Sequence, residues 1–88
     1  MNHPIGFYPQ YQSHKVVGAL KIKQIIASVK GLGATIVPED ENYGAFEVSD
    51  EYMTKHKPKE GGYYVVYQDG YESWSPADVF EKGYTKIN

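Results

Sequence analysis

The sequence predicts a small α+β domain, a mostly antiparallel β-sheet with two short helices at about residues 49–56 and 76–82. Three observations support this fold class. The chain has 88 residues, a length that allows a single domain. Segments rich in β-branched and aromatic residues are separated by glycine-containing turns, as in antiparallel hairpins. Two serines stand directly before acidic or proline-led segments, a pattern typical of helix N-termini.

Residues 1–14 are predicted to form an N-terminal arm or tail, followed by a single β-rich domain at residues 15–88. The arm contains two prolines and no alternating hydrophobic pattern. Its aromatic residues Phe7, Tyr8 and Tyr11 leave two alternatives open. The arm is either a free terminus or a segment docked onto the domain or onto a neighbouring subunit.

Residues 16–29 fit both helical and strand spacing of apolar side chains, and their density of β-branched residues favours a strand. Residues 30–33 include two glycines and predict a turn into a second strand at residues 34–37. We therefore expect a hairpin. Pro38 and an acidic run end it, and residues 45–48 are predicted to form a short third strand.

The first helix is predicted to begin after Ser49, whose side chain can accept a hydrogen bond from an N–H group of the first turn. Asp50 and Glu51 follow, where the helix dipole favours acidic residues. We expect this helix to stop before Pro58, because proline cannot continue a helix.

A second hairpin is predicted around residues 69–70, which are Asp-Gly, the preferred two-residue type I′ turn between β-rich segments. This turn would pair Val65 with Trp74 across the hairpin. The face carrying both is the predicted core face, with Trp74 largely buried against Val65. Tyr64 and Tyr71 would share the opposite face.

The second helix is predicted to have Ser75 as its N-cap and Pro76 as its first residue. We expect Val79 and Phe80 to point inward and Gly83 to end the helix. The C-terminal residues that follow can add a last strand.

Composition excludes several functions. All nine cationic residues are lysines and the formal net charge is −2, so duplex nucleic acid is not an expected partner. Cysteine is absent, which removes disulfides and thiol chemistry. No apolar run approaches the roughly 18 residues that span a bilayer, and the N-terminus lacks a signal-peptide pattern. We expect no membrane partner and a cytoplasmic location.

No catalytic or metal site is expected. His3, His14 and His56 lack metal-ligand spacing. Each serine is better explained as a cap or strand residue than as a nucleophile, and no glycine-rich phosphate loop is present. We therefore expect a non-enzymatic protein without a cofactor.

The segment from residue 62 to residue 84, GYYVVYQDGYESWSPADVFEKGY, resembles a C-terminal segment common in small tailed-phage and prophage proteins. Residues 13–58 also look like one such family, so the resemblance covers most of the chain. More distantly, the terminal segment is similar to the end of phage anti-Thoeris sponges, which sequester a cyclised ADP-ribose immune signal. The resemblance implies a phage-encoded protein of the host cytoplasm that counters host defence.

Aromatic residues are in excess, since nine tyrosines and one tryptophan exceed what a core of this size needs. They form either a second packed layer or subunit interface, or a stacking surface for a base or partner. In the second case, Lys57 and Lys59 would hold the phosphate of a cyclic nucleotide or NAD-derived signal, with Tyr64 and Tyr71 stacked on its base. The excess of tyrosine also predicts a homo-oligomer, most simply a two-fold dimer.

The leading hypothesis is therefore a non-enzymatic phage protein that counters host defence by sequestering a nucleotide signal. Two alternatives stay open. One is a phage accessory or structural protein acting through protein–protein contacts, and the other is a direct protein inhibitor of a host nuclease complex.

Overall fold

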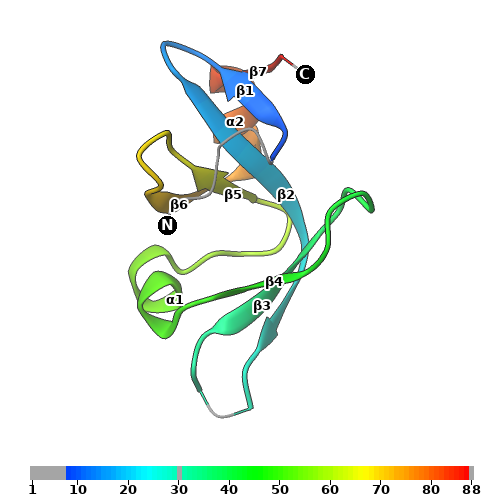
Figure 1. The fold of residues 1–88 in the computed structure, drawn as a ribbon, viewed down its shortest axis with the longest axis vertical. Coiled ribbons are helices and arrows are strands. Elements are labelled where there is room, and N and C mark those ends of the chain that lie inside the picture. Colours follow the sequence, from blue (N-terminus) through cyan, green and yellow to red (C-terminus); the bar gives the residue numbers. More distant parts are fainter. Residues whose placement is uncertain (1–7, 30, 88) are drawn as a thin grey trace.

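The computed structural model describes residues 8–29 and 31–87 and contains a seven-stranded antiparallel sheet with two helices (Figure 1). The predicted α+β class is confirmed. In chain order the elements are β1 (Gln10–Gln12), β2 (Val16–Ala27), β3 (Ala34–Pro38), β4 (Phe46–Val48), α1 (Asp50–His56), β5 (Tyr63–Val66), β6 (Glu72–Ser75), α2 (Ala77–Gly83) and β7 (Thr85–Lys86).

The long strand β2 organises the sheet, as Figure 1 shows. Its first half pairs with β1 and β5, and its second half pairs with β3. The register with β3 shifts between Ile22 and Gln24, and such irregularities bend a strand. Because β2 and β3 pair antiparallel, the hairpin predicted for residues 16–29 and 34–37 is confirmed.

The predicted arm, residues 1–14, lies partly outside the described residues. Its described end includes β1, which pairs with β2 and with β7, so these residues form part of the sheet. The ring of Tyr11 packs edge-on against Phe80, with 4.9 Å between the ring centroids. This part of the arm is docked onto its own domain.

The core has two hydrophobic clusters, on opposite faces of β5. All residues of β5 are buried because α2 covers one face, while α1, β3 and β4 cover the other. The first cluster contains Ile22, Ala34, Ile36, Val48, Tyr52, Tyr64 and Val66. The second contains Val17, Ala19, Tyr63, Val65 and Phe80.

Helix α1 begins as predicted, because the Ser49 hydroxyl accepts a hydrogen bond of 2.9 Å from the backbone N–H of Tyr52. The helix ends at His56, one residue before Lys57, which adopts a left-handed conformation with φ 45°. The Lys57 N–H donates to the carbonyl of Met53, as is common at helix C-termini.

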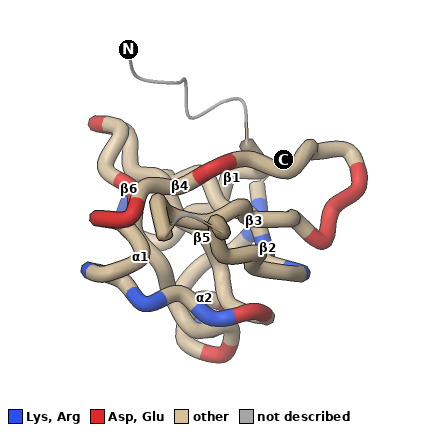
Figure 2. The backbone as a smooth tube through the Cα atoms, turned by 90° about the horizontal axis from the view of Figure 1, so that it is seen from below, with Lys and Arg blue, Asp and Glu red and all other residues tan. Residues whose placement is uncertain are grey.

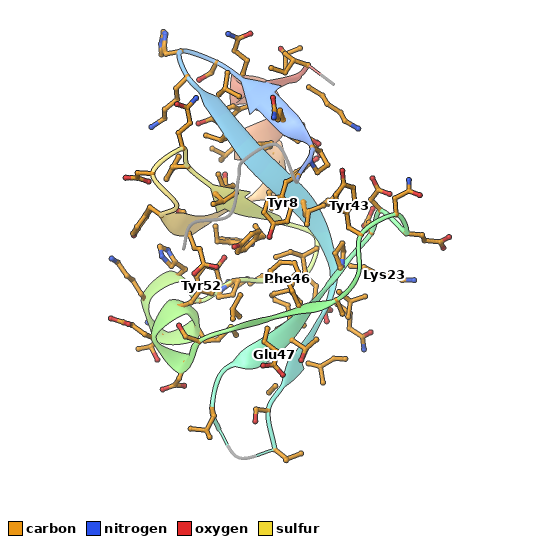
Figure 3. The ribbon with its side chains drawn as sticks, viewed as in Figure 1. Tyr8, Lys23, Tyr43, Phe46, Glu47 and Tyr52 are labelled. Atoms are coloured by element: carbon orange, nitrogen blue, oxygen red, sulfur yellow. The ribbon has the colours of Figure 1, made fainter. Side chains whose placement is uncertain are left out.

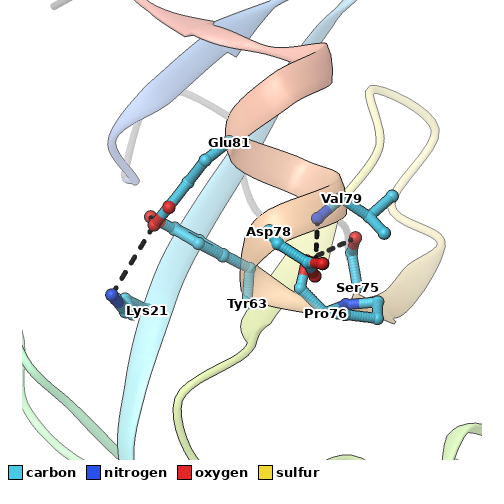
Figure 4. Close-up of polar contacts among 7 residues, drawn as sticks. All are labelled: Lys21, Tyr63, Ser75, Pro76, Asp78, Val79 and Glu81. Carbon is cyan, nitrogen blue, oxygen red and sulfur yellow. Dashed lines mark hydrogen bonds and ion pairs between the residues drawn. The ribbon is translucent and has the colours of Figure 1, made fainter.

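Helix α2 differs from the prediction at its start. Pro76 occupies the N-cap position, and the Ser75 hydroxyl donates to the Pro76 carbonyl instead of capping the helix (Figure 4). Phe80 points inward as predicted, but Val79 is 60% exposed. Adjacent helical residues point about 100° apart, so a helix of two turns buries only one of this pair.

The predicted register of the β5–β6 hairpin was wrong by one residue. Val65 lies opposite Ser73, and Tyr64 lies opposite Trp74. The loop has three residues, 68–70, because the Gly70 N–H donates to the Tyr67 carbonyl and the Tyr67 N–H donates to the Tyr71 carbonyl. Gly70 has φ +90°, as in a type I turn followed by a left-handed residue.

The shift changes the environment of Trp74. Its ring faces the first cluster beside Tyr64 instead of Val65, and the side chain is only half-buried. The indole covers Gly62, where a Cβ atom would overlap it. The indole N–H is buried and has no hydrogen-bond acceptor within the described part of the chain.

Candidate protein-interaction surface

One side of the molecule carries an exposed group of aromatic and cationic side chains around the β5–β6 loop (Figure 1). Tyr71 lies at the centre of this group and is 42% exposed. Around it lie residues from the β1–β2 turn, from the loop and from α1. We call this group the Tyr71 surface; it consists of Lys15, Lys55, His56, Tyr67 and Tyr71.

The corrected register creates the aromatic centre of this surface. Tyr67 and Tyr71 face each other across the loop, and their rings stack with centroids 5.9 Å apart and an interplanar angle of 7°. The Lys15 ammonium lies 4.5 Å from the centroid of the Tyr67 ring. A cation over an aromatic face is attracted by the ring quadrupole, so Lys15 and the ring pair hold one another in place.

Helix α1 adds a second cation on the other side of the pair. The Lys55 ammonium lies 5.1 Å from the centroid of the Tyr71 ring. Contact with Tyr71 raises the pKa of Lys55, with a smaller contribution from Glu51, so this lysine stays charged at neutral pH. His56 Nε2 lies 3.4 Å from the Tyr71 hydroxyl.

Two hollows flank the Tyr71 ring. The larger, of about 410 Å³, is lined by Lys15, Val16, Tyr67, Gln68, Asp69 and Tyr71. The smaller, of about 280 Å³, lies towards α1, and its lining includes Glu51, Lys55, His56 and Glu72. The surface therefore has an aromatic ridge between two depressions, a shape into which side chains of another protein can fit.

Tyr64, predicted to stack on a base, is a core residue and is 1% exposed. Three rings that surround it, those of Tyr8, Phe46 and Tyr52, are labelled in Figure 3. Burial, followed by the hydrogen bond to Glu72, raises the pKa of its hydroxyl. No face of this ring is open to a ligand, and only Tyr71 of the predicted stacking pair lies on the surface.

Lys57 and Lys59, predicted to hold a phosphate, are both exposed. Lys59 lines a separate hollow of about 460 Å³ beside Gly62 and Trp74. Neither lysine lines the hollows around Tyr71. The four predicted site residues therefore do not converge on one depression.

Lys15 and Tyr67 belong to the Tyr71 surface but were absent from the predicted site. The three-residue loop places Tyr67 beside Tyr71, and a loop of this length would have indicated the pair from the sequence. No signal in the sequence indicated Lys15, because its approach depends on pairing of β2 with β5.

A second exposed feature is the tip of the β2–β3 hairpin, which projects at one end of the molecule (Figure 1). Three apolar side chains stand there in solvent: Ile26 is 48% exposed, Leu32 is 72% exposed and Val29 is 99% exposed. Their exposure distinguishes them from the apolar residues of the first half of β2, which are mostly buried.

Neither described helix has the length and apolar composition needed to cross a membrane. Within residues 8–29 and 31–87, no three histidine, aspartate or glutamate side chains come together as metal ligands do.

No protein-family model matches the chain, and no curated protein matches it. Among solved structures, it is similar to the NMR solution structure of the monomeric form of the phage L decoration protein. The two share 29% sequence identity and superpose with a TM-score of 0.70. The match covers 89% of this chain and 58% of that protein, so this chain spans less than two thirds of the decoration protein's length.

Proposed function

We propose that this chain is a phage accessory protein that acts through protein–protein contacts, as a decoration protein bound to the surface of a phage particle. The observation that carries the proposal is the similarity to the phage L decoration protein, which extends over 89% of the chain at 29% identity. In this role the protein performs no catalysis and needs no cofactor.

The exposed side chains are of the kinds that protein interfaces use. Tyrosine is enriched at interface centres, where its ring supplies contact area and its hydroxyl supplies a hydrogen bond. The Tyr71 surface offers two such rings with cations on either side. The hairpin tip offers apolar side chains.

The test is binding to particles of the phage that encodes the chain, prepared from a strain with its gene deleted. Purified protein is added at increasing concentration, and the particles are pelleted through sucrose. We expect binding that saturates at a fixed number of copies per particle. Protein that stays in the supernatant at every concentration, over particles verified to be intact, would contradict the proposal.

The nucleotide-sponge hypothesis predicts a different result. It requires the rings of Tyr64 and Tyr71 on the surface to stack on a base, and the ring of Tyr64 is buried. Purified protein would be mixed with cyclic nucleotides and NAD-derived signals, washed and denatured by heat. We expect no nucleotide to be released, whereas stoichiometric release of any of them would favour the sponge over the decoration protein.

A further inference from the structure

The second half of β2 has an open edge. β5 pairs with β2 as far as Lys21, and the turn before β5 adds two hydrogen bonds of 2.8 Å between Ile22 and residues 61–62. Beyond Ile22, β3 continues along the other edge of β2 to Ala27 (Figure 1). Within residues 8–29 and 31–87, no strand pairs with this half of β2 on the side that β5 leaves free.

The backbone hydrogen-bonding groups of Ile25 and Ala27 point to this open edge. The Ser28 N–H donates to the Gly33 carbonyl at 3.1 Å, so the backbone of Ser28 faces β3. Consecutive residues of a strand alternate in direction, which turns Ala27 and Ile25 the other way. The Ile25 N–H agrees with this, because it donates to the Glu60 carboxylate at 3.0 Å instead of to a strand. The N–H and carbonyl of Ala27 meet no strand in the described part of the chain.

The same edge exposes apolar side chains. Ile26 is 48% exposed and Val29, just beyond the strand, is 99% exposed. Natural proteins usually protect such an edge with charged residues, proline or a covering segment, because its unpaired groups can pair with another strand. Among the described residues, the group that occupies this edge is the Glu60 carboxylate, which is itself exposed.

We propose that the open edge of β2 pairs antiparallel with the same edge of a second copy, about a two-fold axis beside Ile26. Ile25 of each copy then exchanges hydrogen bonds with Ala27 of the other, and the two Ile26 side chains face each other. Their position is a non-hydrogen-bonded one, where Cα atoms lie about 4.5 Å apart. The Glu60 carboxylate releases the Ile25 N–H when the strands pair. This pairing does not depend on the proposed function.

Two features identify a second copy as the occupant. An edge of alternating donors and acceptors is its own complement when an identical edge runs antiparallel to it, as a two-fold interface requires. β2 also carries two lysines and no acidic residue (Figure 2), so the arriving strand attracts the displaced Glu60 carboxylate instead of repelling it. No residue of this edge belongs to the Tyr71 surface, so Tyr71→Ala should leave the dimer unchanged.

Cysteine cross-linking tests the register, since the chain contains no cysteine of its own. Two Ile26→Cys side chains that face each other would lie within the range in which a disulfide forms. We therefore expect a covalent dimer of Ile26→Cys under mild oxidation. Val79→Cys, which places a comparably exposed thiol on α2, is the control and should stay largely monomeric. Equal cross-linking of both variants, or none of Ile26→Cys, would overturn the proposal.

Sedimentation of variants tests the pairing itself. Ile26→Lys puts like charges opposite each other, and we expect the dissociation constant of the dimer to rise about tenfold or more. Glu60→Ala frees the Ile25 N–H in both copies, so the dissociation constant should fall about tenfold. Glu41→Ala removes an exposed acid of the β3–β4 loop and should leave the dissociation constant unchanged.

The outcomes separate this inference from the proposed function. Particle binding by an Ile26→Lys variant that no longer dimerises would support both. A dimer that Ile26→Lys leaves intact and Tyr71→Ala dissociates would place the contact on the Tyr71 surface and overturn the inference alone. Equal tightening by Glu60→Ala and Glu41→Ala would mean that net charge governs association, which also overturns it. A protein that stays monomeric at every concentration, while Ile26→Lys prevents particle binding, would assign the edge to a strand of a particle protein.

Discussion

The hydroxyl of Tyr64 donates a hydrogen bond of 2.6 Å to the carboxylate of Glu72 across the β5–β6 hairpin. The two side chains lie on the same face, because Tyr64 is opposite Trp74 and Val66 is opposite Glu72 in the register. The bond joins a ring of the first cluster to an acid near the surface. Glu72 also lines the smaller hollow of the Tyr71 surface, together with Lys55 and His56.

Removing this hydroxyl should destabilise the protein. Hydrogen bonds to charged groups contribute about 1.5–3 kcal/mol, so we expect Tyr64→Phe to lower the free energy of unfolding by that amount. Urea denaturation measures it. Tyr84→Phe is the control, since its hydroxyl has no hydrogen-bond partner among the described residues. It should change stability by less than about 0.5 kcal/mol. Equal stability of the two variants would contradict the role given to the bond.

Stability should fall at alkaline pH. Burial raises the pKa of Tyr52, Tyr63 and Tyr64 in the folded protein, with hydrogen bonds to acids adding to the shift for the last two. An unfolded tyrosine ionises near pH 10, so above that pH the unfolded state loses protons that the folded state keeps. Each of the three should lower the free energy of unfolding by up to about 1.4 kcal/mol per pH unit above pH 10. Denaturation curves from about pH 8 to 11 measure this, and a flat profile above pH 10 would refute it.

The sequence predicted the helices and most of the strands, but it predicted neither β1, whose residues were assigned to the arm, nor the register of the second hairpin. The Asp-Gly dipeptide is compatible with a two-residue turn and with the end of a three-residue loop, and both place Gly70 at positive φ. Alternation could not decide between them, because β5 is buried on both faces and has large apolar or aromatic residues at every position. A slip of one residue changes which side chains share a face, so Trp74 lies beside Tyr64 instead of Val65. Tyr64 is in the core for a different reason, because both faces of β5 are covered.

The candidate surface was only partly predictable for a related reason. The position of Tyr71 next to the turn can be predicted from the residues of the turn itself. Its neighbours Lys15 and Lys55 come from segments far away in the sequence. Their approach depends on which strands pair and on where α1 packs, and neither is encoded by local spacing. Predictions from capping residues fared better, as at Ser49, because a cap depends on only a few consecutive residues.

Replacing Lys57 by glycine should stabilise the protein. Lys57 has φ 45° and ψ 55°, a left-handed conformation that is unfavourable for residues with a Cβ atom. Glycine adopts it freely but has more freedom to lose on folding, so we expect a net gain of about 0.5–1 kcal/mol for Lys57→Gly. The exposed Lys59, which does not have positive φ, provides the control. Lys59→Gly should bring no gain, and a gain of equal size in both variants would mean that charge, not conformation, is responsible.

Self-association is a separate expectation. The protein has limited core area and an excess of tyrosine, so we expect a two-fold dimer at high concentration. Sedimentation velocity over a range of concentrations measures it. A single species of 10.0 kDa at every concentration would reject the dimer, whereas Tyr71→Ala distinguishes a dimer formed through the Tyr71 surface from one formed elsewhere.

The contact of Trp74 with Gly62 should behave as a coupled pair. A Cβ atom at Gly62 would overlap the indole, so we expect Gly62→Ala to destabilise by about 1–3 kcal/mol, as overpacking does. Trp74→Ala should cost about 3 kcal/mol, the lower end for a tryptophan, because the side chain is only half-buried. Once the ring is absent, the added methyl meets no obstacle. The free energy of unfolding of the double variant should therefore be lower than that of Trp74→Ala by at most about 0.5 kcal/mol.

The control for this cycle is Gly44→Ala, where a new Cβ atom would have no neighbour within 4 Å. Gly44→Ala should change the free energy of unfolding by less than about 0.5 kcal/mol, both in the unchanged protein and in the Trp74→Ala variant. If the costs of Gly62→Ala and Trp74→Ala simply add, the two residues do not limit one another. The indole would then lie away from Gly62 in solution, and the packing of Trp74 against the first cluster would need a different explanation.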